Sequence, residues 1–187
     1  MARNIYGLDL GTYEIKVYDK KQDSTWKEKN VIAIVDGKEI LAVGDEAYAM
    51  FERTPGNIEV VFPMKEGVIS RFTDMQYLLQ NLLKKERRFA RGSEYLIAVP
   101  TDVTEVEKRA IFDLVVHSTA KAKEVSIVER GVAQCIGMGV DVRKTKGMLI
   151  ADFGAATTEL SVVGSGGMVL NKMLKIGGMT FDVAVQN

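Results

Sequence analysis

Two stretches of the chain share a strand–turn–strand pattern. Residues 5–10 are mostly apolar, and apolar and polar side chains alternate in residues 14–19, which predicts a β-hairpin with its turn at Gly11. Residues 148–153 and 157–163 show the same arrangement far along the chain. Because the two hairpins share one sequence pattern, we expect their turns to have the same role.

The residues that follow the first hairpin predict a small unit of short elements. The polar residues 20–30 predict a loop. Two apolar runs within residues 31–43 flank Asp36-Gly37, a dipeptide typical of hairpin turns. Residues 45–53 predict a short helix, which the Pro-Gly that follows would end.

Helical periodicity is clearest in the middle of the chain. A stripe of four leucines predicts a helix over residues 74–89. A continuous apolar run at residues 95–100 predicts a buried strand. Thr104 and Glu107 form a capping-box pattern at the start of the next helix, and a short strand and a small-residue helix come after it.

Strands that alternate with helices, together with hairpins, predict an α/β fold with a mixed sheet and flanking helices. Residues 141–147 have no apolar periodicity and predict a connection between two units. The second unit has three strand-like runs and a helix that starts near Thr180. These elements are too few to cover both faces of a sheet, so we expect this unit to be incomplete or to be completed by another chain.

Composition and charge exclude several classes of protein. Lysine plus arginine and aspartate plus glutamate number 25 each, so no excess of positive charge indicates a nucleic-acid partner. The single cysteine, Cys135, excludes an intramolecular disulfide. No apolar run approaches the roughly 20 residues of a membrane span. The expectation is a cytoplasmic protein, with peripheral contact to the membrane left open.

The two predicted turns carry residues suited to binding phosphate. Glycine allows backbone N–H groups to approach phosphate oxygens, a hydroxyl adds a donor, and a carboxylate holds Mg²⁺ directly or through water. One such turn is typical of an ordinary β-turn, but two copies on either side of a connection favour a nucleotide phosphate tail held between two subdomains. The residues concerned are Asp9, Gly11, Thr12, Asp152, Gly154, Thr157 and Thr158.

At this point the chain resembles a known family. The turn segments are similar to the phosphate-binding hairpins of the superfamily of actin, sugar kinases and heat-shock chaperone ATPases; they read GLDLGT and IADFGAATTELSVV. More specific segments closely resemble the bacterial actin homologues of the MreB type, the rod-shape-determining proteins; they read RTPGNIEVVFPMKEGVI, VPTDVTEVEKRA and KIGGMTFDVAV. The resemblance covers nearly the whole chain.

The resemblance implies an actin-like ATPase fold of the ribonuclease H-like kind. Residues 1–146 would form domain I, with a small insert subdomain at about residues 31–64. Residues 147–187 would form the first strands and the helix start of an incomplete domain II.

The resemblance also implies ATP and Mg²⁺ as cofactors. Asp9 and Asp152 would organise the metal, mainly through water. Two interpretations of Lys16 stay open: it contacts phosphate, or it is a solvated strand residue. The phosphate-binding residues would be Gly11, Thr12, Lys16, Gly154, Ala155, Thr157 and Thr158.

Two departures from the family pattern bear on catalysis. Arg130 stands where the family has the glutamate that positions the attacking water, and arginine stays protonated. Ala155 and Ala156 replace glycines, and each Cβ disfavours positive φ and close backbone approach to phosphate. These departures predict a hydrolysis-deficient chain, in which Arg130 and Thr158 are the remaining candidates for a part in catalysis.

As a function, the resemblance implies cell-shape determination by a cytoskeletal protein. The chain would associate with itself into nucleotide-dependent filaments at the cytoplasmic membrane that guide cell-wall synthesis, and its partners would be cell-wall synthesis and morphogenesis proteins. A non-catalytic regulatory module of the same fold is the alternative, and a small-molecule kinase is the less favoured one. Phe89, Arg88 and Arg91 are candidates for contact with the inner membrane surface, against the alternative of a solvated helix end.

Overall fold

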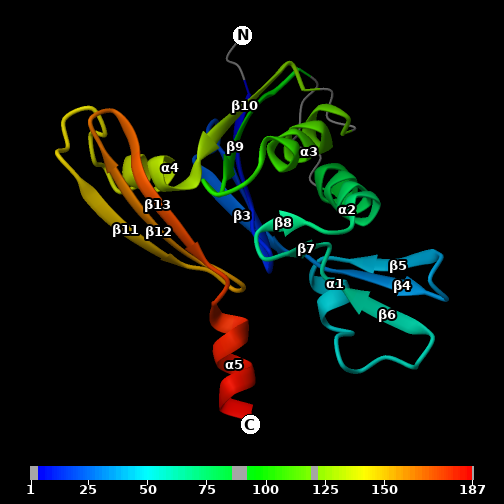
Figure 1. The fold of residues 1–187 in the computed structure, drawn as a ribbon. Coiled ribbons are helices and arrows are strands. Elements are labelled where there is room, and N and C mark those ends of the chain that lie inside the picture. Colours follow the sequence, from blue (N-terminus) through cyan, green and yellow to red (C-terminus); the bar gives the residue numbers. More distant parts are fainter. Residues whose placement is uncertain (1–3, 86–91, 119–121, 187) are drawn as a thin grey trace.

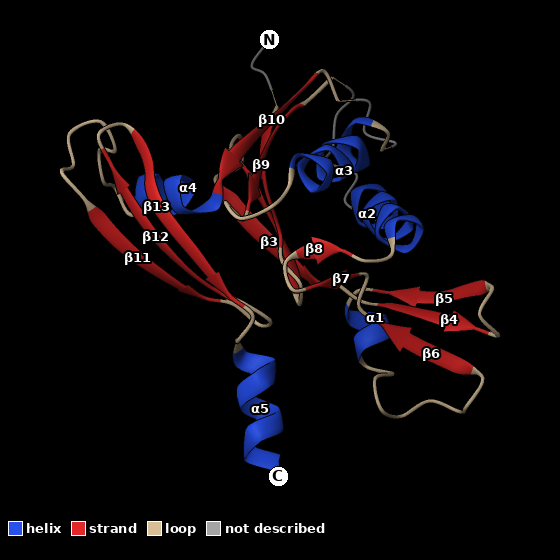
Figure 2. Ribbon diagram, in the orientation of Figure 1, coloured by secondary structure: helices blue, strands red, loops and turns tan. Residues whose placement is uncertain are grey.

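The computed structural model describes residues 4–85, 92–118 and 122–186 (Figure 1). Within these ranges the chain is mixed α/β, as predicted. A five-stranded mixed sheet and a three-stranded antiparallel sheet lie apart, each with helices beside it, and a second three-stranded sheet forms a small unit of its own (Figure 2).

The five-stranded sheet has the strand order β10-β9-β1-β2-β3. The pairs β1–β9 and β9–β10 are parallel, while β1–β2 and β2–β3 are antiparallel. The strands are β1 (Ile5–Leu10), β2 (Glu14–Asp19), β3 (Ser24–Lys29), β9 (Glu94–Val99) and β10 (Glu124–Glu129).

The prediction of a loop over residues 20–30 was wrong, because β3 lies within this range. Six residues of β3 pair with β2, and Trp26 lies opposite Val17 and packs partly against the core. An edge strand has one neighbour and tolerates charged side chains, so Lys27, Glu28 and Lys29 conceal the strand in the sequence pattern.

Helices α2 (Phe72–Lys85) and α3 (Glu105–Val116) cover one face of the five-stranded sheet (Figure 1). The predicted capping box is confirmed, because the Thr104 hydroxyl accepts from the Glu107 N–H and the Glu107 carboxylate accepts from the Thr104 N–H. The leucine stripe of α2 is buried against the sheet, as predicted; it consists of Leu78, Leu79, Leu82 and Leu83.

The small unit between β3 and α2 has its own core. Its sheet contains β4 (Ile32–Val35), β5 (Glu39–Val43) and β6 (Ile58–Val61) in the order β5-β4-β6. Helix α1 (Asp45–Tyr48) packs on this sheet and contributes the buried Ala47. A short hairpin, β7 (Met64–Lys65) with β8 (Val68–Ile69), then leads to α2.

The second part of the chain begins with α4 (Arg130–Gly137), which packs on the sheet β11-β12-β13. The buried residues between them include Cys135, Ile150 and Val163. The strands are β11 (Met148–Phe153), β12 (Thr158–Gly164) and β13 (Gly167–Leu174). The predicted domain limits around residue 146 remain predictions.

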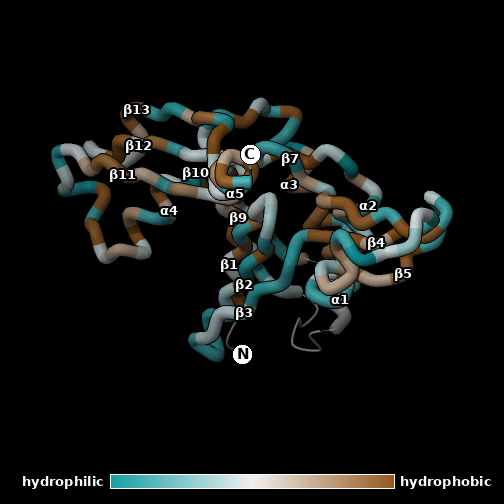
Figure 3. The backbone as a smooth tube through the Cα atoms, turned by 90° about the horizontal axis from the view of Figure 1, so that it is seen from below, coloured by the Kyte–Doolittle hydropathy of each residue, from teal (hydrophilic) through white to brown (hydrophobic). Residues whose placement is uncertain are grey.

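Helix α5 (Gly178–Gln186) follows β13 and buries none of its residues within the described chain. Figure 3 shows that much of α5 is hydrophobic. The outer face of the β11-β12-β13 sheet is also apolar and exposed, as at Leu149 and Phe153. In the described ranges, no helix combines the length and the hydropathy that crossing a membrane requires.

Candidate functional site

The two glycine turns have the same backbone geometry. The Gly11 N–H donates to the Glu14 carbonyl at 3.1 Å, and the Gly154 N–H donates to the Thr157 carbonyl at 2.8 Å. A Cβ on Gly11 would lie 2.6 Å from the Glu14 oxygen, and one on Gly154 would lie 2.9 Å from the Thr157 oxygen. Both turns therefore require glycine, and each leaves two residues at its tip.

Both turns line one cavity of about 250 Å³. The cavity lies between the β1–β2 hairpin and the β11–β12 hairpin, and the start of α4 and Gly67 also line it. The predicted residues that the structure brings together there are Asp9, Gly11, Thr12, Lys16, Arg130, Asp152, Gly154, Ala155 and Thr157.

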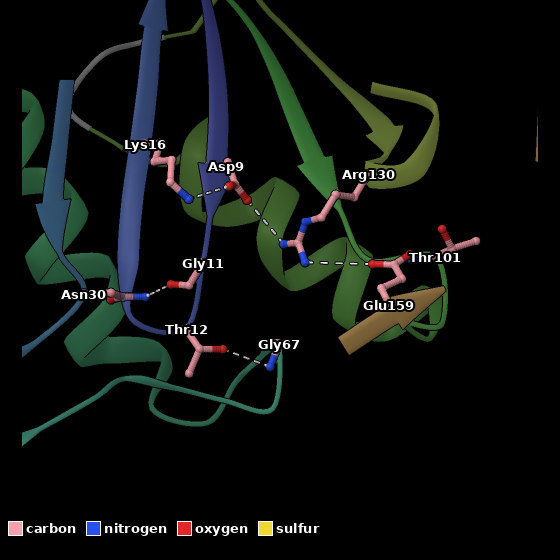
Figure 4. Close-up of polar contacts among 9 residues, drawn as sticks. All are labelled: Asp9, Gly11, Thr12, Lys16, Asn30, Gly67, Thr101, Arg130 and Glu159. Atoms are coloured by element: carbon pink, nitrogen blue, oxygen red, sulfur yellow. Dashed lines mark hydrogen bonds and ion pairs between the residues drawn. The ribbon is translucent and has the colours of Figure 1, made fainter. Parts of the chain in front are cut away.

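The tips of the turns line this cavity and contain N–H groups that make no backbone hydrogen bond within the described chain. Within the described residues, the N–H groups of Thr12, Tyr13, Ala155 and Ala156 make no backbone hydrogen bond. The first turn is fixed from two sides, because Asn30 Nδ2 donates to the Gly11 carbonyl at 2.8 Å and the Gly67 N–H donates to the Thr12 hydroxyl at 3.1 Å (Figure 4). N–H groups without a backbone partner, in two turns that line one cavity, suit the oxygens of a polyphosphate.

A chain of charges crosses the cavity wall from β1 to β12 (Figure 4). Asp9 Oδ2 lies 3.3 Å from Lys16 Nζ, and Asp9 Oδ1 lies 3.3 Å from Arg130 Nη2. Arg130 Nη1 lies 3.9 Å from Glu159 Oε2. The other oxygen of Glu159 accepts hydrogen bonds from the Thr101 N–H at 3.1 Å and from Asn171 Nδ2 at 2.8 Å.

Glu159 was missed by the sequence analysis, although its side chain is only 4% exposed. The signal was an acidic residue inside a strand pattern, on the strand face that also carries Ser161 and Val163. A buried carboxylate needs partners, and those partners come from three separate parts of the chain.

Thr158 does not line the cavity. Thr157, the residue before β12, lines the cavity, whereas Thr158 is not among the lining residues. The Thr158 hydroxyl donates to the Ile176 carbonyl at 2.7 Å and connects β12 to the segment that leads into α5.

A family model for the MreB/Mbl protein matches residues 3–187. The chain belongs to the MreB/Mbl family. It is 37% identical over 195 residues to the cell shape-determining protein MreB of Escherichia coli (strain K12), covering 100% of this chain and 56% of that relative. The chain therefore spans about half the length of this MreB/Mbl-family relative.

Solved structures agree with the family and confirm the predicted actin-like fold. A crystal structure of MreB5 of Spiroplasma citri bound to ADP matches with a TM-score of 0.88 at 30% identity, over 97% of this chain and 55% of that one. The MamK double helical filament matches with a TM-score of 0.79 at 20% identity, over 100% of this chain and 58% of that one, and supports the fold alone.

The alanines of the second MreB/Mbl turn do not carry the predicted backbone strain. Among the described residues, the non-glycine residues with positive φ do not include Ala155 or Ala156. The turn reaches its shape with ordinary φ values, because Gly154 provides the close approach to the Thr157 carbonyl. The backbone of this turn therefore accommodates alanine at both positions without positive φ.

The negative charge of Glu14, which lines the cavity beside the first turn, is compensated locally. Its carboxylate lies 2.8 Å from Lys29 Nζ and 3.5 Å from Lys27 Nζ. The hydrogen bond from Lys29 holds the pKa of Glu14 below its ordinary value. The Tyr13 hydroxyl donates to the Tyr48 hydroxyl at 2.6 Å, and this hydrogen bond raises the pKa of Tyr13 while it connects the turn to α1.

The ion pairs of Asp9 disfavour direct contact with magnesium, and its predicted role through water remains a prediction. Each of its oxygens already faces a protein cation, Lys16 or Arg130, at 3.3 Å. Asp152 lines the cavity, and its carboxylate makes no ion pair or hydrogen bond within the described part of the chain.

The predicted membrane contact of the MreB/Mbl chain lies outside the described residues. Phe89, Arg88 and Arg91 all fall in the range 86–91. Their contact with the inner membrane surface remains a prediction.

Proposed function

We propose that this chain is a nucleotide-binding cytoskeletal protein that associates with itself and takes part in cell-shape determination. The observation that carries the proposal is that two turns of matched geometry line the same cavity. Both tips contain N–H groups that make no backbone hydrogen bond within the described residues. The family membership supports the same proposal, since relatives in the family are named cell shape-determining proteins and MreB5 of Spiroplasma citri binds ADP and AMPPNP.

The polyphosphate is the part of the nucleotide that this cavity suits. Its oxygens would accept from the N–H groups of Thr12, Tyr13, Ala155 and Ala156, and from the side chains of Lys16 and Arg130. A nucleotide bound across both turns would hold the two sheets in one arrangement. Head-to-tail contacts between copies in that arrangement would propagate as a filament.

The proposal includes binding without efficient hydrolysis. Arg130 occupies the cavity wall beside Asp9, where a water-positioning carboxylate would have to act, and a guanidinium cannot accept a proton. The filaments would lie at the cytoplasmic membrane and guide cell-wall synthesis. A regulatory module that binds filaments without turnover is the second candidate. Arg130 is compatible with this candidate and with the filament-forming one.

Sedimentation with and without ATP tests the filament. We expect more of the chain to pellet with ATP than without it, with phosphate release close to background. Gly11→Ala should lose the ATP-dependent pellet, because its Cβ would lie 2.6 Å from the Glu14 carbonyl oxygen. Gly56→Ala is the matched control, since a Cβ there meets no atom within 4 Å. Equal pelleting with and without ATP would contradict the filament and favour the regulatory module.

A further inference from the structure

We propose that Arg130 is a built-in cation of this site, and that the cavity binds the polyphosphate of a nucleotide without a divalent metal ion. The inference rests on the proposed nucleotide binding and adds to it a selectivity for the metal-free ligand.

Arg130 is held in the cavity wall by carboxylates from both sheets (Figure 4). It is the first residue of α4, and its side chain is 13% exposed. Nη2 lies 3.3 Å from Asp9 on β1, and Nη1 lies 3.9 Å from Glu159 on β12. Within the described residues its buried Nε has no hydrogen-bond acceptor. The guanidinium is therefore fixed in position and has donors to spare.

The same contacts put a metal ion at a disadvantage on Asp9. Mg²⁺ prefers an octahedron of oxygen ligands at about 2.0–2.1 Å and keeps several waters. To reach Asp9, it would have to displace Lys16 or Arg130, or stand beside both positive charges. A phosphate oxygen meets no such conflict, because an ammonium has three donors and a guanidinium has five. Both cations can donate to phosphate while they keep Asp9.

The remaining acids of the cavity leave Asp152 as the competing metal ligand. Glu14 is paired with Lys29 and Asp9 is paired with two cations, while Asp152 has no ion pair or hydrogen bond in the described ranges. A metal that bridged Asp152 and phosphate would contradict the inference. The test therefore includes a variant at this position.

Calorimetric titration of the chain with ATP and with inorganic tripolyphosphate, in excess EDTA and in excess MgCl₂, tests the inference. We expect both ligands to bind more tightly in EDTA than in MgCl₂, because the site makes no metal contact and Mg²⁺ in solution holds most of the polyphosphate. Asp152→Asn should not weaken binding in either buffer. Arg130→Gln should weaken binding in EDTA by about 10- to 100-fold, the size of a lost charge-assisted hydrogen bond.

Charge reversal sharpens the test. Arg130→Glu should abolish binding in EDTA and restore part of it in MgCl₂, since a metal would then be needed between two acids and the phosphate. Arg143→Glu is the matched control, because it makes the same charge change on a side chain that is 86% exposed and does not line the cavity. Circular dichroism and thermal unfolding check that each variant is folded.

The results that would contradict the metal-free site differ from those that would contradict nucleotide binding. Binding that requires MgCl₂, or that Asp152→Asn abolishes, would overturn the metal-free site and leave the nucleotide-binding proposal standing. Absence of binding in both buffers would overturn nucleotide binding and the inference with it.

Discussion

Replacing Glu159 with alanine is expected to lower the free energy of unfolding by about 3 kcal/mol. The carboxylate is 4% exposed and accepts from the Thr101 N–H and from Asn171 Nδ2. Its removal leaves both donors unpaired in a buried place, and it leaves Arg130 with Asp9 as its carboxylate partner in the described residues. The loss falls at the lower end of the range for broken buried ion pairs because Asp9 remains.

Urea unfolding followed by circular dichroism measures this loss. Glu159→Gln separates its two parts, since the amide oxygen can still accept from Thr101 and the charge is gone. Glu105→Ala is a control for a surface ion pair, as Glu105 is 87% exposed and pairs with Lys108. If Glu159→Ala lowered the free energy of unfolding no more than Glu105→Ala does, the contacts of Asp9, Arg130 and Glu159 would not stabilise the packing of the two sheets.

Gly177→Ala is expected to cost about 3 kcal/mol and to weaken ATP binding at the same time. A Cβ at this buried position would lie 2.6 Å from the Gly154 carbonyl oxygen and 2.7 Å from the Ala155 carbonyl. Those neighbours are backbone atoms, which cannot rotate away as a side chain can. The second turn would have to move away from the first turn of α5.

Two hydrogen bonds would be broken by that movement, from the Gly178 N–H to the Gly154 carbonyl at 3.0 Å and from the Met179 N–H to the Ala155 carbonyl at 2.8 Å. Thermal unfolding and calorimetric titration measure the two effects. Gly147→Ala is the control, since a Cβ there meets nothing within 4 Å. Unchanged stability together with unchanged affinity would show that α5 does not position the second turn.

The two hairpins could be predicted from the sequence because their signals come from residues close together in the chain. Alternation defined the strands, and Gly11 and Gly154 marked the turns that close them, so both could be placed without knowledge of the rest. The capping box at Thr104 was predictable for the same reason, since its partner Glu107 lies three residues away. Such features depend on neighbours in the chain.

Features that depend on distant residues were missed. β3 is a strand because β2 is beside it, and its own charged residues give no alternating pattern. The role of Glu159 depends on Thr101, Arg130 and Asn171, which come from three different segments. The ion pairs of Asp9 likewise involve Arg130, which lies 121 residues away, and they disfavour direct contact between Asp9 and a metal.

Hydrogen–deuterium exchange with and without ATP tests the central claim most directly, that both turns face one polyphosphate. We predict that the amides of Thr12 and Tyr13 in the first turn and of Ala155 and Ala156 in the second gain protection together, with one dependence on ATP concentration, because free N–H groups of both tips line one cavity. Protection of one turn alone, or of neither at saturating ATP, would contradict the account.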